Sequence, residues 1–399
     1  MKSRLVVLPC IHVMIVLILM PSFVQAQELS FTLIGQLVIG NDEDAPAEYV
    51  FTFPELVRTD SKSYIYIHDR RRADVQVFDE GEQYVTTIGK RGEGPGEMRE
   101  IVSMHVDARD RLIVADRNSR RFTVFSDLGD HFETKAFPDD LAVALDPILS
   151  LEDSFVLKYV RAYDDPEQKL PYIADTKTLH HYDMPLNPIE AFAELGDIFD
   201  LDEPFEKANS DIHDALKMAT NGIDKIVLVP EVYGGHAYRY TYVGGTWDME
   251  KLQGAPVPKK PYMLVSKKDF EANPDLKRSS LVISGPSGVH RARIFNWSLG
   301  VVILSSGEIV NFTKQTPLRE NPNHRIEVSH RVELFDQAGV LMGYGPLQFD
   351  DQRLNRSVKI MSTIDILWID DDDQLYLRRL NEHGFYILSV AELVIGRPN

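Results

Sequence analysis

The residues best suited to chemistry in this sequence are cations, chiefly arginines, that recur in short polar segments along the chain. A guanidinium group is planar and binds a carboxylate or a phosphate through two parallel hydrogen bonds. Tyrosine and histidine rings beside it offer surfaces on which a sugar ring or a peptide can stack. The pattern predicts one face that binds an anionic ligand, built from Arg70, Arg72, Arg117, Arg121, Arg161, Tyr163, Tyr233, His236, Arg239, Arg325, Arg378 and His383.

Two other groups of residues invite a metal hypothesis. The stretch "WIDDDDQLYL" at 368–377 holds four consecutive aspartates, and hard cations such as calcium prefer clustered carboxylates. Its spacing is not that of an EF-hand, and it aligns with "VDARDRLIV" at 106–114, which favours a solvated hairpin turn. His105 and His290 are candidates for a central zinc, while His180 and His181 are neighbours that a strand would point to opposite faces. No metal and no cofactor is therefore expected.

A repeat of short strands must position these residues. "YIYIHDRRRADVQVFDEGEQYVTTIG" from Tyr64 and "RLIVADRNSRRFTVFSDLGDHFETKAF" from Arg111 have the same order of strands and turns, with Phe78 and Phe125 in matching places. A period of this size with several strands is typical of propeller blades. Four more degraded copies follow, so the prediction is an all-β, six-bladed β-propeller with four-stranded antiparallel blades. The last blade lacks one strand, which the segment near 29–40 supplies by pairing with the segment near 385–395, so that an N-terminal strand closes the ring.

The motif "GEGPGEM" at 92–98, followed by "VDARDRLIVADRNSRRFTVF", resembles the six-bladed β-propeller family of exported bacterial proteins related to NHL repeats. The close match covers residues 64–137. The resemblance implies the fold and no particular activity, because such propellers serve as scaffolds, binders and enzymes.

The motif "GEGPGEM" itself predicts a tight path from the rim of one blade to the axis of the next, since glycine permits positive φ and proline restricts it. A phosphate-binding loop is the alternative, but no helix follows it. "GYGPLQF" at 343–349 is interpreted as a second copy of this loop, between blades 5 and 6. Residues 186–223, with helix-like spacing at Ile212 and Leu216, and residues 255–289 are interpreted as insertions in one domain over 27–399.

The first 26 residues have a basic start, an apolar run and small residues at the end, which is typical of a secretory signal peptide. Pro21 interrupts the run, so a retained transmembrane anchor is the less favoured alternative. Cys10, the only cysteine, lies in this leader, and no disulfide is expected. The full chain has a net charge of −18, and removing the leader with its two cations takes it to −20. Such a charge disfavours nucleic acid and anionic membranes as partners.

Three functions remain open from the sequence. The first is an exported, periplasmic or surface binding module whose partner is an anionic glycan, an envelope component or an acidic protein surface. The second is a propeller hydrolase or lactonase with a central divalent metal, although no GxSxG, HExxH or GxxxxGK[ST] motif occurs. The third is a purely structural scaffold. If neighbouring carboxylates already bind the arginines, the hypothesis of an anion-binding face loses its basis.

Overall fold

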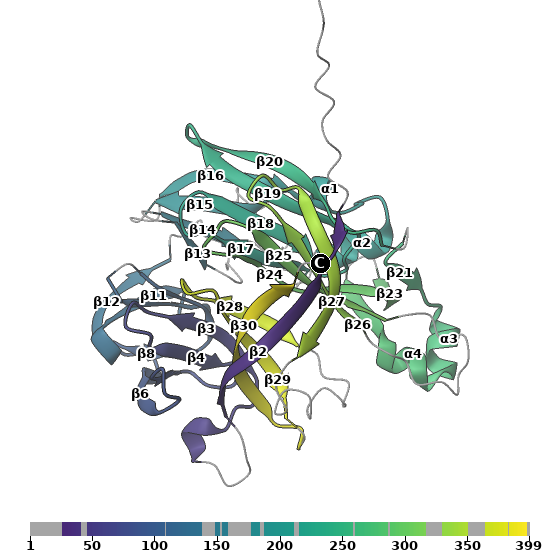
Figure 1. Ribbon diagram of the computed structural model, residues 1–399. Helices are drawn as coiled ribbons and strands as arrows, with labels where there is room; N and C mark the ends of the chain where they lie inside the picture. Colours follow the sequence, from purple (N-terminus) through teal and green to yellow (C-terminus); the bar gives the residue numbers. More distant parts are fainter. Residues whose placement is uncertain are drawn as a thin grey trace, which may run out of the picture.

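The computed structural model covers the predicted repeat and both insertions (Figure 1). It describes residues 26–396 apart from 41–45, 108, 138–147, 152–153, 159–176, 184–186, 211–214, 258–259, 286–287, 317–328, 350–363 and 382. The predicted signal peptide lies outside the described residues except for Ala26. Among the described residues, no helix is long and apolar enough to cross a membrane.

Six four-stranded antiparallel blades follow one another along the chain, as predicted. Blades 1 to 3 consist of β3 (Pro54–Thr59), β4 (Ile65–Asp69), β5 (Val75–Phe78), β6 (Tyr84–Ile88); β9 (Ile101–Val106), β10 (Leu112–Asp116), β11 (Arg121–Ser126), β12 (Asp130–Ala136); and β13 (Ile148–Leu151), β14 (Ser154–Lys158), β15 (Lys177–Asp183), β16 (Pro188–Glu194). Blades 4 to 6 consist of β17 (Leu216–Thr220), β18 (Lys225–Pro230), β19 (His236–Val243), β20 (Thr246–Gln253); β24 (Asn296–Ile303), β25 (Ile309–Gln315), β26 (Ser329–Phe335), β27 (Leu341–Phe349); and β28 (Asp365–Ile369), β29 (Gln374–Leu380), β30 (Tyr386–Gly396), β2 (Ser30–Ile39).

Local turn chemistry explains why the repeat folds into hairpins. Asp60, Asp107 and Asp370 each follow the first strand of a blade. The Oδ1 of each carboxylate accepts hydrogen bonds from the backbone N–H groups two and four residues later, at 2.8–3.1 Å. This arrangement fixes the turn into the second strand. The four aspartates at 370–373 therefore begin with a turn residue, as the hairpin interpretation predicts.

The first strands of the blades contact one another in a closed cycle, β3 to β9, β13, β17, β24, β28 and back to β3, so they surround the axis of the ring. Within the described residues, one buried apolar cluster lies between each pair of neighbouring blades. Between blades 1 and 2, for example, Val75 and Val77 pack with Met98 and Phe125. Burial of apolar surface between blades is thus what holds the ring together.

The N-terminal strand β2 pairs antiparallel with β30, from Ser30 opposite Gly396 to Ile39 opposite Leu388. It also runs parallel to β27 and so joins blades 5 and 6 into one sheet. The interpretation of "GYGPLQF" as a crossover loop is wrong, because these residues lie in β27. Their glycines have another role: a Cβ on Gly345 would lie 1.8 Å from the carbonyl oxygen of Leu29. The glycine is needed where the N-terminal chain crosses β27.

"GEGPGEM" forms the compact connection that the sequence predicts. The short strand β7 (Lys90–Arg91), directly before the motif, pairs with β8 (Glu97–Met98) at its end. The Gly94 N–H donates to Glu97 Oε2 at 2.9 Å. The guanidinium of Arg121 donates to the carbonyl oxygens of Glu93 at 2.9 Å, Gly94 at 3.2 Å and Glu97 at 2.6 Å. The loop is therefore held by its own side chains and by the next blade.

The insertion predicted at 186–223 is wrong at both ends, because β16 and β17 belong to blades 3 and 4. Only α1 (Leu195–Ile198) and α2 (Pro204–Ser210) interrupt the described blade strands there, and Ile212 lies outside the described residues. Leu216 belongs to a strand because it pairs with Pro230 on β18. The second insertion extends to residue 294 and contains β21 (Tyr262–Leu264), α3 (Lys267–Ala272), α4 (Pro274–Ser279), β22 (Ser280–Gly285) and β23 (Gly288–Ile294).

The two insertions form one body, which we call the lobe (residues 195–210 and 260–294). Its three-stranded sheet has the order β21-β23-β22, and α2 packs on β22 and β23. Phe205 of α2 is buried against Tyr262 and Ile283. The Tyr262 hydroxyl donates to Glu203 Oε2 at 3.1 Å and to Glu206 Oε1 at 3.2 Å. In Figure 1 the sheet with α3 and α4 projects from the rim of the ring near β26.

Candidate functional site

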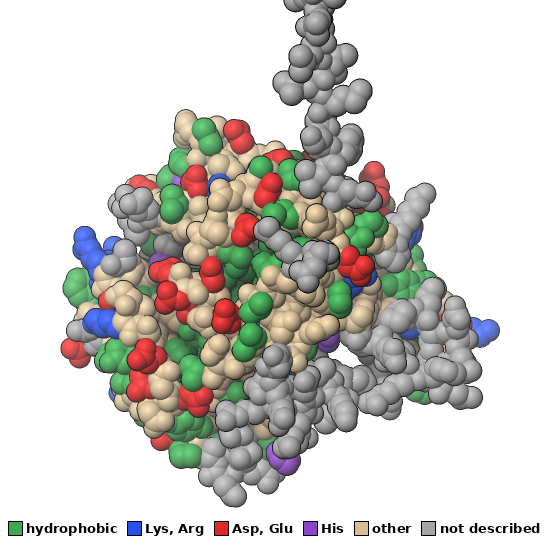
Figure 2. Space-filling model, viewed as in Figure 1, with side chains coloured by type: hydrophobic (Ala, Val, Ile, Leu, Met, Phe, Trp, Pro, Cys, Tyr) green, Lys and Arg blue, Asp and Glu red, His purple; other side chains and the backbone are tan. Residues whose placement is uncertain are grey.

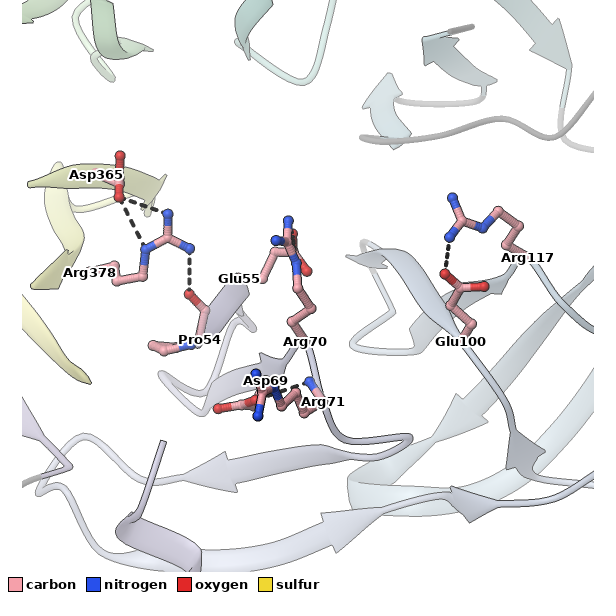
Figure 3. A network of polar contacts seen from close by, with 9 residues as sticks. All are labelled: Pro54, Glu55, Asp69, Arg70, Arg71, Glu100, Arg117, Asp365 and Arg378. Atoms are coloured by element: carbon pink, nitrogen blue, oxygen red, sulfur yellow. Dashed lines mark hydrogen bonds and ion pairs between the residues drawn. The ribbon is translucent and has the colours of Figure 1, made fainter. Parts of the chain in front are cut away.

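The structure brings together three of the predicted arginines, from blades 6, 1 and 2, at the end of the ring where the first strands begin (Figure 3). Arg70, Arg117 and Arg378 lie within two residues of the end of the second strand of their blades. Each faces a carboxylate within two residues of the start of the first strand of the same blade. We call these three ion pairs the axial site: Arg70–Glu55, Arg117–Glu100 and Arg378–Asp365.

The strand register produces this arrangement. Asp69 and Asp116 end the second strands of blades 1 and 2, and both are buried. Their carboxylates accept backbone N–H groups from the chain that enters the first strand, as Asp116 does from Arg99 at 2.8 Å and from Glu100 at 3.1 Å. The arginine that follows each aspartate therefore lies opposite the entering chain, next to the acidic residue there.

Arg378 connects two blades. Its Nε and Nη2 donate to Asp365 Oδ2 at 3.1 and 2.7 Å, and its Nη1 donates to the carbonyl oxygen of Pro54 in blade 1 at 3.1 Å. The ring of Phe53 lies 3.7 Å from the Arg378 guanidinium carbon and 4.7 Å from that of Arg70. The aromatic ring thus holds two guanidinium groups in place through cation–π contacts.

The pairs are partly accessible to solvent, least of all Arg378–Asp365, whose side chains are 13% and 23% exposed. The side chains of Arg117 and Glu100 are 32% and 33% exposed, and the side chain of Arg70 is about half exposed. Donors and acceptors are therefore presented side by side with little net charge. Exposed ion pairs of this kind contribute only about 0–1 kcal/mol each to stability, so their arrangement matters more for what they present than for folding.

Blades 4 and 5 continue the ring of charge. Lys217 lies 3.6 Å from Glu231, with the cation on the first strand and the acid after the second strand, the reverse of blades 1, 2 and 6. Lys314 of blade 5 lies 5.6 Å from the centre of the Trp297 ring. The pKa of Lys314 is lowered, because burial outweighs the opposing effect of the carboxylates of Asp365 and Glu231.

Most of the other predicted residues do not face a ligand. Tyr233 is completely buried and donates to Glu333, so it cannot contact a ligand at the surface. Arg239 lies within β19 instead of a loop, and it binds Glu250 and the carbonyl oxygens of Gln337 and Ala338. Arg121 donates hydrogen bonds to the carbonyl oxygens of the "GEGPGEM" loop, as described above.

The Arg72 guanidinium donates two hydrogen bonds to the carboxylate of the nearby Asp74, at 2.6 and 3.1 Å. This hydrogen bond raises the pKa of Arg72. His236 is half-buried, and burial followed by the charge of Lys251 lowers its pKa. His383 is exposed in a turn, where its backbone N–H donates to Asn381 Oδ1 at 3.0 Å. Arg161, Tyr163 and Arg325 lie outside the described residues.

Sequence reasoning missed Glu55, Glu100 and Asp365, the acidic half of the site. A usable signal is present: each acid precedes its arginine by 13 to 17 residues, across one hairpin.

The same pairs bear on the hypothesis of a central metal. Carboxylates from three neighbouring first strands are a suitable start for a cation site, but each is already bound to a guanidinium of its own blade.

The histidines considered for metal binding or catalysis have other contacts. His105 lies on first strand β9, where burial followed by the charge of Arg58 lowers its pKa to about 3. His181 Nδ1 accepts a hydrogen bond from the Trp247 indole at 3.3 Å, so its Nε2 carries the proton toward Ser154 Oγ at 2.8 Å. A ring in that tautomer cannot take the serine proton. Among the described residues, no three His, Cys, Asp or Glu side chains gather closely enough to hold a metal ion.

Comparison with known proteins agrees with this architecture. Residues 53–203 match a family model described as a 6-bladed beta-propeller, and the ring of six blades identifies the protein as a six-bladed β-propeller. A member of the duf4221 family from Bacteroides vulgatus superimposes with a TM-score of 0.57 at 12% identity, covering 91% of this chain and 98% of that chain. A Bacteroides fragilis protein described as exported superimposes with a TM-score of 0.53 at 12% identity, covering 93% and 100%. Both show the fold alone. No curated protein matches this chain.

Proposed function

We propose that this protein is an exported binding module whose ligand contacts the axial site. Export rests on the signal-like first 26 residues and on the similarity in fold to the Bacteroides fragilis protein that is described as exported. The observation that carries the binding role is the convergence of three arginine–carboxylate pairs, each partly accessible to solvent, from blades 6, 1 and 2.

The pairing of each arginine with a carboxylate changes the class of ligand that we expect at the axial site. An anion would have to displace a carboxylate that already occupies the guanidinium, and the remaining acid would repel it. A ligand that carries both hydrogen-bond donors and acceptors, such as the hydroxyl groups of a neutral sugar, can bind both members of each pair without breaking it. We therefore propose a neutral polyhydroxylated ligand in place of an anionic glycan, a phosphorylated envelope component or an acidic protein surface.

A binding screen at two salt concentrations tests the proposal. The purified protein is incubated with neutral oligosaccharides, acidic polysaccharides and peptides at about 0.1 M and about 1 M salt, where the screening length is about 10 Å and about 3 Å. We expect neutral oligosaccharides to bind with little dependence on salt. Binding confined to acidic polysaccharides and lost in salt would instead support the anionic ligand.

Two variants locate the site. Arg117→Met and Glu100→Gln each remove one member of a partly exposed pair. Both should reduce affinity for the oligosaccharide at least about tenfold, corresponding to about 1.4 kcal/mol. Arg111→Met is the matched control, because Arg111 pairs with Asp107 at 2.6 Å in the hairpin turn at the opposite end of the same hairpin. Unchanged affinity in both site variants would contradict the proposal.

A further inference from the structure

Blade 5 departs from the pattern of charge pairs at the end of the ring that carries the axial site. In blades 1, 2, 4 and 6 a cation at this end faces a carboxylate of its own blade. In blade 5 the cation is Lys314, and the residue opposite it on the first strand is Trp297. On the third strand it faces His330. Within the part of the chain that the structure describes, Lys314 forms no ion pair with a carboxylate.

The three residues lie on one face of the blade, because side chains directly opposite one another on antiparallel strands have their Cβ atoms only about 4.5–5.5 Å apart. The Lys314 Nζ lies 5.6 Å from the centre of the Trp297 ring. That ring also packs against the apolar cluster of the lobe, which holds it in place. Phe312, two residues before Lys314 on the same face, is buried in the cluster between blades 5 and 6. The amine therefore lies at the edge of an apolar core.

These surroundings favour the neutral form of the amine. Burial lowers the pKa of Lys314 more than the carboxylates of Asp365 and Glu231 raise it. Burial, followed by the charge of Lys314, lowers the pKa of His330 to about 4, so this ring is uncharged at neutral pH. An aromatic ring stabilises an ammonium group less than a paired carboxylate does. Lys314 is thus the free amine more often than a paired lysine, and the free amine is the nucleophilic form.

The neighbours of Lys314 place it within the ring of charge. Asp365 and Glu231 are acids of blades 6 and 4, which flank blade 5 on its two sides. Lys314 itself is half-buried, so part of its side chain is exposed. We propose that Lys314 is the nucleophile of a carbonyl-binding site, where it condenses reversibly with the aldehyde of a reducing sugar. That the aldehyde belongs to a sugar rests on the function proposed above, whereas the reactivity of the amine does not.

The condensation needs no further reagent. The lone pair of the Lys314 Nζ forms a bond to the carbonyl carbon, and the π electrons of the C=O bond move to its oxygen. The two protons of the amine are transferred to that oxygen, which leaves as water, and a C=N bond remains. Nothing is oxidised or reduced, and water reverses the step. The Trp297 ring offers an apolar surface to the C–H groups of the sugar, while the charged pairs of the axial site bind hydroxyl groups.

Reductive trapping in the purified protein tests the amine by itself. Glycolaldehyde is added in limiting amount at neutral pH with cyanoborohydride, which delivers a hydride to the imine carbon and makes the adduct permanent. Peptide mapping by mass spectrometry then compares lysines of one chain. Lys217 is the matched control, because it lies at the same end of the ring, is 24% exposed and pairs with Glu231 at 3.6 Å. Lys314 should react at least about tenfold faster than Lys217. Equal rates would overturn the proposal.

Glucose in place of glycolaldehyde tests the class of ligand. We expect glucose to be trapped at Lys314 in preference to Lys217, because the open-chain form supplies the aldehyde and the surrounding site binds the hydroxyl groups. A preference for Lys314 with glycolaldehyde but not with glucose would refute the assignment to a reducing sugar.

A double variant separates this inference from the proposed function. Arg378→Met/Asp365→Asn removes the axial pair of the neighbouring blade without leaving one charge alone. It should slow the trapping of glucose at Lys314 at least about fivefold, through lost hydrogen bonds to hydroxyl groups, without slowing that of glycolaldehyde. Equal trapping of glucose in the variant and the parent protein would support the nucleophile and count against the axial site. Circular dichroism establishes that the variant folds like the parent protein.

Discussion

The hydroxyl of Tyr233, in the loop after the second strand of blade 4, donates a hydrogen bond to the carboxylate of Glu333 in the third strand of blade 5. Asn311 Nδ2 and the backbone N–H of Ala255 donate to the same carboxylate, each at 2.9 Å. Ala255 is where the chain leaves blade 4 toward the lobe. A single buried acid therefore joins two blades and holds the root of the lobe.

This buried acid predicts a pH dependence of stability. Burial raises the pKa of Glu333 above its usual value of 4.5, although its three donors oppose the shift. The stability that Glu333 contributes is therefore fully present below about pH 4.5 and is lost as pH rises through the folded-state pKa. Glu333→Gln removes the ionisation, so its free energy of unfolding should fall less than that of the parent protein between about pH 4.5 and pH 8. Urea denaturation at several pH values measures this, and parallel curves for the two proteins would contradict it.

The close approach of Leu29 to Gly345 predicts that ring closure is sensitive to one methyl group. In Gly345→Ala the new Cβ meets the backbone of the N-terminal chain, which cannot move without disturbing the pairing of β2. We expect a loss of at least about 2 kcal/mol, in the range of overpacking and strain. Gly196→Ala is the control, because its Cβ would meet only Leu201 at an ordinary 3.8 Å. Equal melting temperatures for the two variants would show that the N-terminal chain does not need this glycine.

The hydrogen bonds of Arg121 to the "GEGPGEM" loop predict that removing this side chain destabilises the protein. Arg121→Met removes three hydrogen bonds from a charged donor to the loop carbonyls and should destabilise the protein by about 1–3 kcal/mol. Limited proteolysis should then cut within residues 92–98 sooner than in the parent protein. Arg109→Met, at an exposed position of the next hairpin turn, should change the unfolding free energy by less than about 0.5 kcal/mol. A protected loop in the Arg121 variant is the result that would count against this role.

The hydrogen bonds of the aspartates at 370–373 predict that chelators do not change the thermal stability of the protein. Asp370 is occupied by the N–H groups of its own turn and by the Tyr376 hydroxyl at 3.0 Å. Asp373 accepts the N–H and the hydroxyl of Ser305 in blade 5, at 2.7 and 2.8 Å. Dialysis against EDTA should therefore leave the melting temperature unchanged. A drop that added calcium restores would revive the metal hypothesis.

Local features of the sequence determined the number of blades and the nature of the hairpins. The turn aspartates bind N–H groups two and four residues later, so the interaction that shapes each turn is complete within one short segment. The alternation of apolar residues then decides which face of each strand is buried. Both features can be read in one pass along the chain, and the six blades predicted from them are present.

Only the tertiary structure decided what the arginines bind. Arg70 and Arg72 lie in one short polar segment of the sequence, and Arg117 and Arg121 lie in another. In the structure, Arg70 and Arg117 bind acids across a hairpin, whereas Arg72 binds the nearby Asp74 and Arg121 binds backbone carbonyls. Likewise, the two insertions look unrelated in sequence and pack into one lobe. A long side chain binds whichever partner the packing of strands brings within reach, and that packing is set by apolar burial between blades, far from the charges themselves.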